Sequence, residues 1–178
     1  MHNTRVTERK LRKKIKQECN FNLFFNTFGN NCQRYESYPL KVKIMPTIHT
    51  VYQGELRTQL THVASGQQII TDAPVDNQGK GKAISPTDML SASLGSCMLT
   101  IMGIAARTHG ININDVELTI TKHMVANPRK IGKIEVVFSN FPDQLDAHQK
   151  LLLEKAAKTC PVALSLHPDL EQTFQFNW

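Results

Sequence analysis

The strongest constraint on the fold is one long uncharged helix, which begins at Ser85 and ends at Gly110. Ser85 suits the cap position, Pro86 suits the first helical position, and Asp88 completes a start signal like a capping box. Gly110 suits the left-handed residue that often ends a helix. No residue from 89 to 106 is charged, and apolar side chains occur nearly all the way round. The pattern therefore predicts a central helix that is buried on most faces.

The stretches on either side of this helix predict a mixed α+β fold. The expected elements, in chain order, are strands over Ile48–Val63 and Gln67–Thr71, the central helix, strands over Val116–Val125 and Ile131–Phe138, a helix over Gln144–Thr159, a short helix over Val162–Leu166 and a strand over Thr173–Trp178. The main order is β-β-α-β-β-α-β. Two long helices among several strands favour helices packed on an antiparallel sheet.

The first 44 residues differ in composition from the rest of the chain. Residues 1–43 carry ten Lys and Arg against three Asp and Glu. The apolar stretch Leu23–Phe25 is too short for a membrane span. We predict a disordered basic extension over residues 1–44 and one domain over residues 45–178. A second interpretation is that translation starts at Met45, where regular patterning begins, and that residues 1–44 are an upstream artefact.

The charge and cysteine content of the domain exclude several classes of function. Residues 45–178 carry eleven Lys and Arg against twelve Asp and Glu, so the domain lacks the strong positive charge that nucleic-acid binding needs. We expect no nucleic-acid partner, no membrane and a cytoplasmic location. The histidines are scattered, and neither a CxxC nor an HExxH motif is present. We therefore expect no metal and no cofactor.

Two cysteines of the domain could carry chemistry. Cys97 lies in the middle of the central helix, and Cys160 precedes Pro161 at a helix break. A reactive thiol needs a stabilised thiolate, and Cys97 is too deep in its helix for the dipole to supply that. A cation brought by the fold is the simplest source. Arg57 is favoured over two other arginines of the domain, which are Arg107 and Arg129. The alternative is that Cys97 packs as a small apolar side chain and that Cys160 only ends a helix.

The runs around these two cysteines resemble a known family. SPTDMLSASLGSCMLTIMGIAAR, followed some sixty residues later by TCPVALSLHP, is similar to the OsmC/Ohr family of thiol-dependent hydroperoxide reductases. The resemblance covers residues 45–178. It implies an intertwined homodimer with two sites at the interface. By motif position, Cys97 would attack the peroxide and Cys160 would resolve the sulfenic acid as a disulfide. Arg57 corresponds by spacing to an arginine of the family's first hairpin.

One position departs from the family pattern. The hydroperoxidase members open the helix with N-P-E, and the Glu position is Thr87 in this chain. The nearest acid, Asp88, is displaced by one residue. One residue is a rotation of about 100° on a helix, so Asp88 should face elsewhere and serve the cap.

Two functions remain open at this point. The first is a homodimeric thiol peroxidase that reduces organic or hydrogen peroxides in oxidative-stress defence. Cys97 and Cys160 are its redox pair, Arg57 stabilises the thiolate, and an external dithiol is the reductant. The second is a binding module without peroxidase activity, which holds a small hydrophobic or thiol ligand at the dimer interface. The missing Glu favours the binding module, and the two retained thiols favour the peroxidase.

Overall fold

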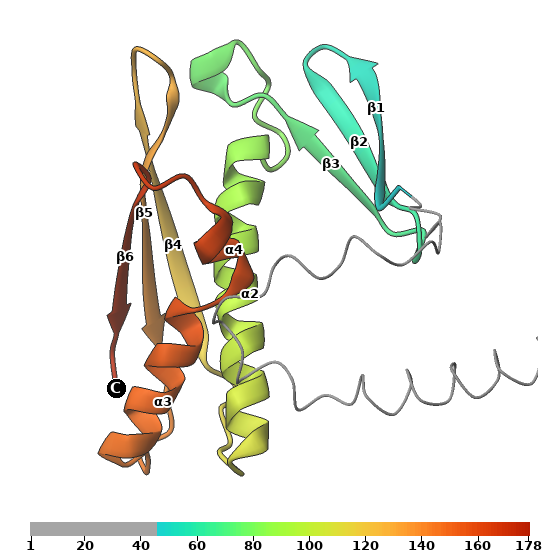
Figure 1. The fold of residues 1–178 in the computed structure, drawn as a ribbon. Helices are drawn as coiled ribbons and strands as arrows, with labels where there is room; N and C mark the ends of the chain where they lie inside the picture. The colour runs from blue at the N-terminus through green and yellow to red at the C-terminus, as the bar shows by residue number, and fades with distance from the viewer. Residues whose placement is uncertain (1–45) are drawn as a thin grey trace, which may run out of the picture. The chain divides into compact units, whose positions relative to one another are not determined.

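The computed structural model describes residues 46–178, and the extension predicted over residues 1–44 lies outside them. Helix α2 (Pro86–Thr108) is the longest element and packs on one side against a three-stranded sheet and two shorter helices (Figure 1). This α+β arrangement is the predicted fold class. The helix is long and apolar enough to cross a membrane by length and composition alone, but here it forms part of the core.

The signals that predict both ends of α2 are confirmed. The Ser85 hydroxyl accepts the Asp88 N–H at 3.1 Å, and an Asp88 carboxylate oxygen accepts the Ser85 N–H at 3.0 Å. Both bonds of a capping box are therefore present. At the other end, Gly110 has a φ of 64°, and the Ile111 N–H donates to the Ala106 carbonyl at 2.9 Å. This is the left-handed stop expected from Gly110.

The first sheet contains one strand more than the sequence predicts. The segment predicted as a single strand over Ile48–Val63 is a hairpin of β1 (Ile48–Gly54) and β2 (Arg57–His62). Its turn places Glu55 and Leu56 at φ values of 50° and 63°. Such turns usually carry Asn or Gly, so these two residues give no turn signal in the sequence. Strand β3 (Gln68–Asp72) pairs antiparallel with β2 and completes the sheet.

The second sheet contains β4 (Glu117–Val125), β5 (Lys130–Ser139) and β6 (Glu171–Phe176). Strands β4 and β5 are antiparallel, as predicted, but β6 runs parallel to β5. The expectation of a purely antiparallel sheet is wrong at this strand. Helices α3 (Ala147–Lys158) and α4 (Pro161–Ser165) separate the two strands, and a crossover of this length allows parallel pairing.

The core forms where α2 meets the second sheet and α3. It combines Leu94, Met98 and Met102 of α2 with three side chains of β5 and two of α3, namely Ile134, Val136, Phe138, Leu153 and Ala157. The opposite side of α2 is only partly covered within one chain, and Leu90 is 38% exposed there. The prediction of burial on most faces therefore holds for one side of the helix.

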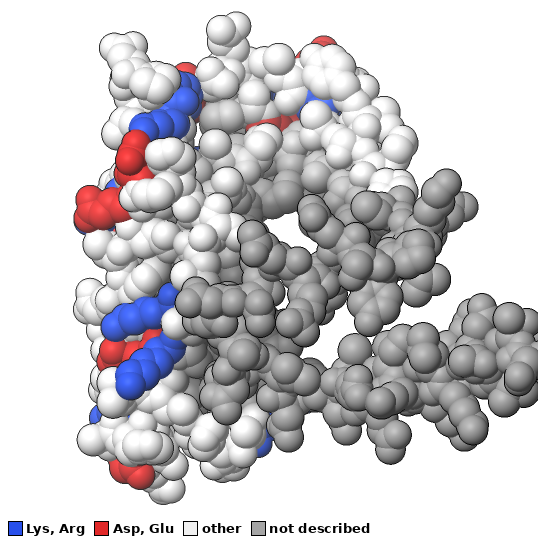
Figure 2. Space-filling model, viewed as in Figure 1, with Lys and Arg blue, Asp and Glu red and all other residues white. Residues whose placement is uncertain are grey.

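Charges of both signs are mixed on the surface of the second sheet and α3. Figure 2 shows Lys and Arg beside Asp and Glu along this face. Ion pairs on these elements include Lys133–Glu135 at 2.7 Å and Lys158–Glu154 at 3.0 Å. This face therefore has no extended patch of one sign.

Candidate functional site

The two cysteines of the domain lie beside one another. Cys97 comes from the middle of α2, and Cys160 from the junction of α3 and α4, both of which contact α2. Cys160 is fully buried and Cys97 is half-buried. Burial raises the pKa of the Cys160 thiol, and the neighbouring Cys97 side chain raises it further. The fold thus joins two thiols that are 63 positions apart in the sequence and leaves one of them more accessible than the other.

Pro161 explains the position of Cys160. A residue before proline is pushed out of the helical region, and Cys160 has a φ of −66° and a ψ of 144°. Helix α3 therefore ends at Lys158, and α4 begins at Pro161 with Cys160 as its cap. The Ala163 N–H donates to the Cys160 Sγ at 3.3 Å. This contact fixes the sulfur at the start of α4, against α2.

Arg57 is engaged by a carboxylate of the next strand. Its Nε donates to one oxygen of Asp72 at 2.7 Å, and its Nη2 donates to the other at 2.8 Å. The Asp72 side chain is 3% exposed, and it also accepts the Lys82 N–H at 3.1 Å. The Arg57 guanidinium holds the pKa of Asp72 below its usual range, and Asp72 raises the pKa of Arg57.

Arg57 makes its polar contacts within the first sheet rather than with the thiols of its own chain. Arg57 and Asp72 are direct partners across β2 and β3, and they share a face of the first sheet with Ile70. No hydrogen bond or ion pair joins Arg57 to Cys97 or Cys160 within residues 46–178. One chain therefore brings together two of the three predicted site residues.

The two less favoured arginines also lie away from the thiol pair. Arg107 is exposed in the last turn of α2, about three turns beyond Cys97. Arg129 lies in the turn between β4 and β5 and donates to Asp76 at 2.8 Å. Neither position places a guanidinium beside Cys97.

At the start of α2, Lys122 contacts Thr87, the residue that stands where the hydroperoxidase members have Glu. The Lys122 Nζ donates to the Thr87 hydroxyl at 2.8 Å and lies 2.6 Å from an Asp88 oxygen. Lys122 holds the pKa of Asp88 below its usual range, with help from Ser85. Asp88 therefore serves the cap, as its displacement by one residue predicts. It does not face away from Thr87, however, because the Lys122 ammonium contacts both residues.

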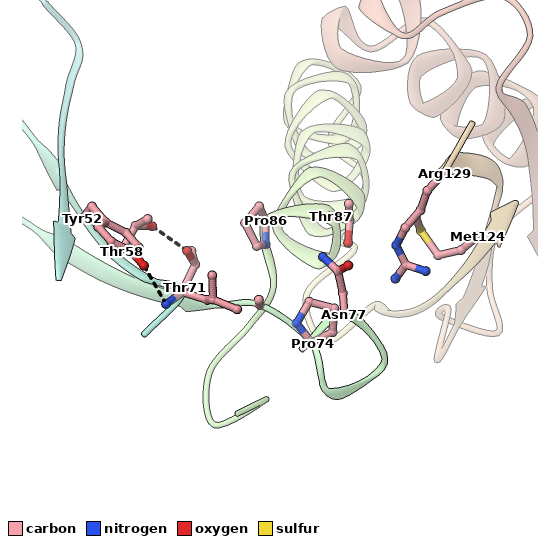
Figure 3. A pocket seen from close by; sticks show the side chains of 11 residues that line it. Tyr52, Thr58, Thr71, Pro74, Asn77, Pro86, Thr87, Met124 and Arg129 are labelled. Carbon is pink, nitrogen blue, oxygen red and sulfur yellow. Dashed lines mark hydrogen bonds between the residues drawn. The ribbon is translucent and has the colours of Figure 1, made fainter. Parts of the chain in front are cut away.

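A cavity of about 350 Å³ lies between the first sheet, the start of α2 and the β4–β5 turn (Figure 3). Apolar groups and hydroxyl side chains line most of it, and Arg129 points toward Asn77 on one side. Tyr52, Thr58 and Thr71 form the opposite side, on the sheet face that Arg57 does not share. Neither cysteine lines this cavity, so its walls and the thiol pair are two separate features of one chain.

Sequence reasoning missed Asp72 and Lys122. Asp72 follows the predicted return strand, and only the register of β2 and β3 shows that it faces Arg57. Lys122 gives a usable signal, because it shares its strand face with Leu118, Ile120 and Met124, which pack on the core. In the described part of the chain, no cluster of three or more His, Cys, Asp or Glu side chains could hold a metal ion.

Comparison with known proteins identifies the family. The sequence pattern of the OsmC-like protein family matches residues 79–173, which include both cysteines, Thr87 and Lys122. The chain belongs to the OsmC-like protein family. No curated protein matches it.

Several solved OsmC-like structures share this fold. A candidate osmotic stress induced and detoxification response protein from Psychrobacter arcticus 273-4 is 46% identical, with a TM-score of 0.73, over 78% of this chain and 100% of that one. An organic hydroperoxide resistance protein OsmC from Legionella pneumophila is 17% identical, with a TM-score of 0.58, over 76% and 100%. An OsmC-like protein from Mycoplasma pneumoniae is 18% identical, with a TM-score of 0.63, over 76% and 97%. The last two show a shared fold alone.

Proposed function

We propose that this OsmC-like protein is a thiol peroxidase that reduces organic or hydrogen peroxides. The observation that carries the proposal is the pairing of a half-buried Cys97 with a fully buried Cys160. The accessible sulfur suits the first attack on a small peroxide. The buried Cys160 sulfur lies beside Cys97 and suits the second step, because it can react only with the sulfenic acid that forms on Cys97.

Each step balances with the two thiols and one peroxide. The Cys97 thiolate attacks a peroxide oxygen, the O–O bond breaks, and the leaving alcohol or water takes up a proton. Cys97 is then a sulfenic acid. The Cys160 sulfur attacks the Cys97 sulfur, water leaves, and a disulfide forms. An external dithiol reduces the disulfide by thiol–disulfide exchange.

Steady-state kinetics test this assignment. With dithiothreitol as reductant and tert-butyl hydroperoxide or hydrogen peroxide as substrate, Cys97→Ser should lower turnover by about 10³-fold or more. Cys160→Ser should react once and then lose turnover as Cys97 overoxidises. Ser96→Ala is the matched control, since Ser96 is an exposed neighbour on α2. Equal turnover in Cys97→Ser and the parent would refute the proposal.

The same proposal includes a homodimer in which each site uses two chains. Arg57 contacts neither thiol of its own chain, so an arginine that stabilises the Cys97 thiolate would have to come from the partner. The exposed apolar side chains of the first sheet support this arrangement. They include Ile48, Val51, Tyr52, Ile69 and Ile70, all at least 42% exposed.

Mixing two inactive variants tests the shared site. An Arg57→Ala chain and a Cys97→Ser chain each lack one group, but a mixed dimer contains one complete site. A 1:1 mixture that exchanges chains should regain about a quarter of the parent rate. If Arg57 acted within its own chain, no mixed dimer would have a complete site and no activity would return.

A second function is favoured by the cavity in Figure 3. Its apolar walls and hydroxyl side chains suit a small hydrophobic ligand, and neither thiol lines it. In this function the protein binds a ligand without reducing peroxide, and the cysteines are not required. Unchanged binding of a hydrophobic fluorescent probe such as ANS in Cys97→Ser, together with no peroxide turnover in the parent, would favour it.

A further inference from the structure

We infer that Asp72 is the positioning residue for Arg57, a role that rests on the proposed thiol chemistry. Arg57 lies on β2, where a free arginine side chain would sample many rotamers. Two parallel hydrogen bonds to one carboxylate, at 2.7 and 2.8 Å, restrict the guanidinium to one plane and one direction. A single contact would not fix that plane.

Asp72 is itself held rigidly. Its side chain is 3% exposed, it pairs directly with Arg57 across two strands, and it accepts the Lys82 backbone N–H. The carboxylate therefore cannot follow Arg57 into solvent. Because the carboxylate is held in one place, it sets the orientation of the Arg57 guanidinium.

The pair leaves part of the guanidinium available. Arg57 has five N–H donors, and Asp72 occupies one on Nε and one on Nη2. Among the described residues, Nη1 has no hydrogen-bond partner, and the side chain remains 35% exposed. The free edge can face a thiolate or a peroxide oxygen while the other edge stays on Asp72.

The start of α2 does not offer a competing carboxylate. Thr87 binds Lys122, and Asp88 is shared between Ser85 and Lys122. Within residues 46–178, the carboxylate paired with Arg57 is that of Asp72. In this chain the arginine is thus oriented from β3.

Alkylation of Cys97 by iodoacetamide across pH tests this role without requiring peroxide turnover. All variants carry Cys160→Ser, with the adducts assigned by peptide mapping. Arg57→Ala should move the midpoint of the alkylation rate to higher pH, because the thiolate loses its cation. If Asp72 positions Arg57, Asp72→Asn should also move the midpoint to higher pH. Asp72→Glu should bring the midpoint part of the way back to its value in the chain with native Asp72.

The direction in which Asp72→Asn moves the alkylation midpoint shows whether Asp72 positions Arg57 or only neutralises its charge. If Asp72 only neutralised Arg57, its removal would leave a stronger cation and move the midpoint to lower pH. That result, or a midpoint equal to the parent's, would overturn the inference. Asp143→Asn is the matched control, because it removes the same kind of charge from an exposed residue of the loop between β5 and α3, outside the first sheet. It should leave the midpoint unchanged.

A second variant, Arg57→Lys, and a second measurement, the rate of peroxide reduction, also test the role of Asp72. Arg57→Lys keeps the charge but cannot make the two-bond contact, so it should behave like Asp72→Asn even if Asp72→Asn folds poorly. On the parent background, Asp72→Asn should lower the rate constant for peroxide reduction by about tenfold or more. If the parent reduces no peroxide, the peroxidase proposal fails, while the alkylation series still decides the role of Asp72.

Discussion

The carboxylate of Asp88 serves two partners at the start of α2. It accepts the Ser85 N–H at 3.0 Å and lies 2.6 Å from the Lys122 ammonium. The same lysine donates to Thr87, so the hydroxyl at that position is also engaged. A residue that looks like a displaced catalytic acid in the sequence is thus part of the helix cap and of a contact between α2 and β4.

The pH dependence of folding should show this role of Asp88. Lys122 lowers the pKa of Asp88 in the folded state, so its charged form stabilises the protein at neutral pH. That stabilisation is lost as pH falls through the lowered pKa. In urea denaturation, Asp88→Asn should therefore have a lower free energy of unfolding than the parent at pH 7, and the difference should shrink in acid.

The size of this difference should be modest, because the Asp88 side chain is 46% exposed and solvent screens the pair. Asp143→Asn, an exposed acid with no ion pair in the described part of the chain, is the control and should follow the parent at every pH. A gap between Asp88→Asn and the parent that stays constant down to acid pH would contradict the assignment.

At the residue scale, the sequence predicts the thiols better than their charged neighbours. Cys97 and Cys160 stand in recognisable surroundings, a helix interior and a Cys-Pro break. The partner of Arg57 depends on which residue of β3 lies opposite it, and sequence spacing alone does not give that register. Lys122 could have been found, since it interrupts the apolar face of an otherwise alternating strand.

At the scale of elements, Gly95 is a point of close packing between α2 and the second sheet. A Cβ at Gly95 would lie 2.6 Å from the Ile120 Cδ1 and 2.9 Å from the Leu118 Cδ1. The absence of a side chain therefore lets the helix approach β4 closely. At Gly103, farther along α2, an added Cβ would have no other atom within 4 Å in the same chain.

Substitution of Gly95 tests this close packing. Gly95→Val should lower the free energy of unfolding by about 1–3 kcal/mol, because Leu118 and Ile120 must move. Gly103→Ala is the control and should raise it by up to about 1 kcal/mol through helix propensity. Urea denaturation at fixed protein concentration gives both values. A Gly95→Val protein as stable as the parent would show that α2 and β4 are not closely packed there.

The boundaries of the elements follow from the sequence where a local rule decides them. Ser85, Gly110 and Pro161 set the ends of three helices through capping and the restriction before proline. The hairpin at Glu55 and Leu56 has neither Asn nor Gly at its two central positions, so the sequence pattern predicts one strand there. The direction of β6 depends on how α3 and α4 cross the sheet, which is a property of the tertiary fold.

At the scale of the whole molecule, the first sheet is too uncovered to stand alone. Every residue of β1 except Gly54 is exposed, and β2 is nowhere fully buried. Three strands need an apolar face covered by another layer for stability. A second copy of the chain, which also has a half-covered α2, is the partner that our proposal assigns to this surface.

Sedimentation of the full chain tests this assignment. We expect a dimer at micromolar concentration. Ile69→Lys, which places a charge on the uncovered sheet, should shift the protein toward monomer. Thr121→Lys is the control, since Thr121 is exposed on β4 and lies opposite Glu135, and it should leave the dimer intact. A stable folded monomer of the parent protein would contradict the proposal.

In the proposed function, Cys97 and Cys160 form one redox pair. The most direct test is peptide mapping by mass spectrometry after one equivalent of tert-butyl hydroperoxide is added to the reduced protein. We expect a Cys97–Cys160 disulfide in the parent, and in Cys160→Ser an addition of about 16 Da on Cys97. If Cys97 stays reduced under excess peroxide, the two thiols are only neighbours in the core and the claim is wrong.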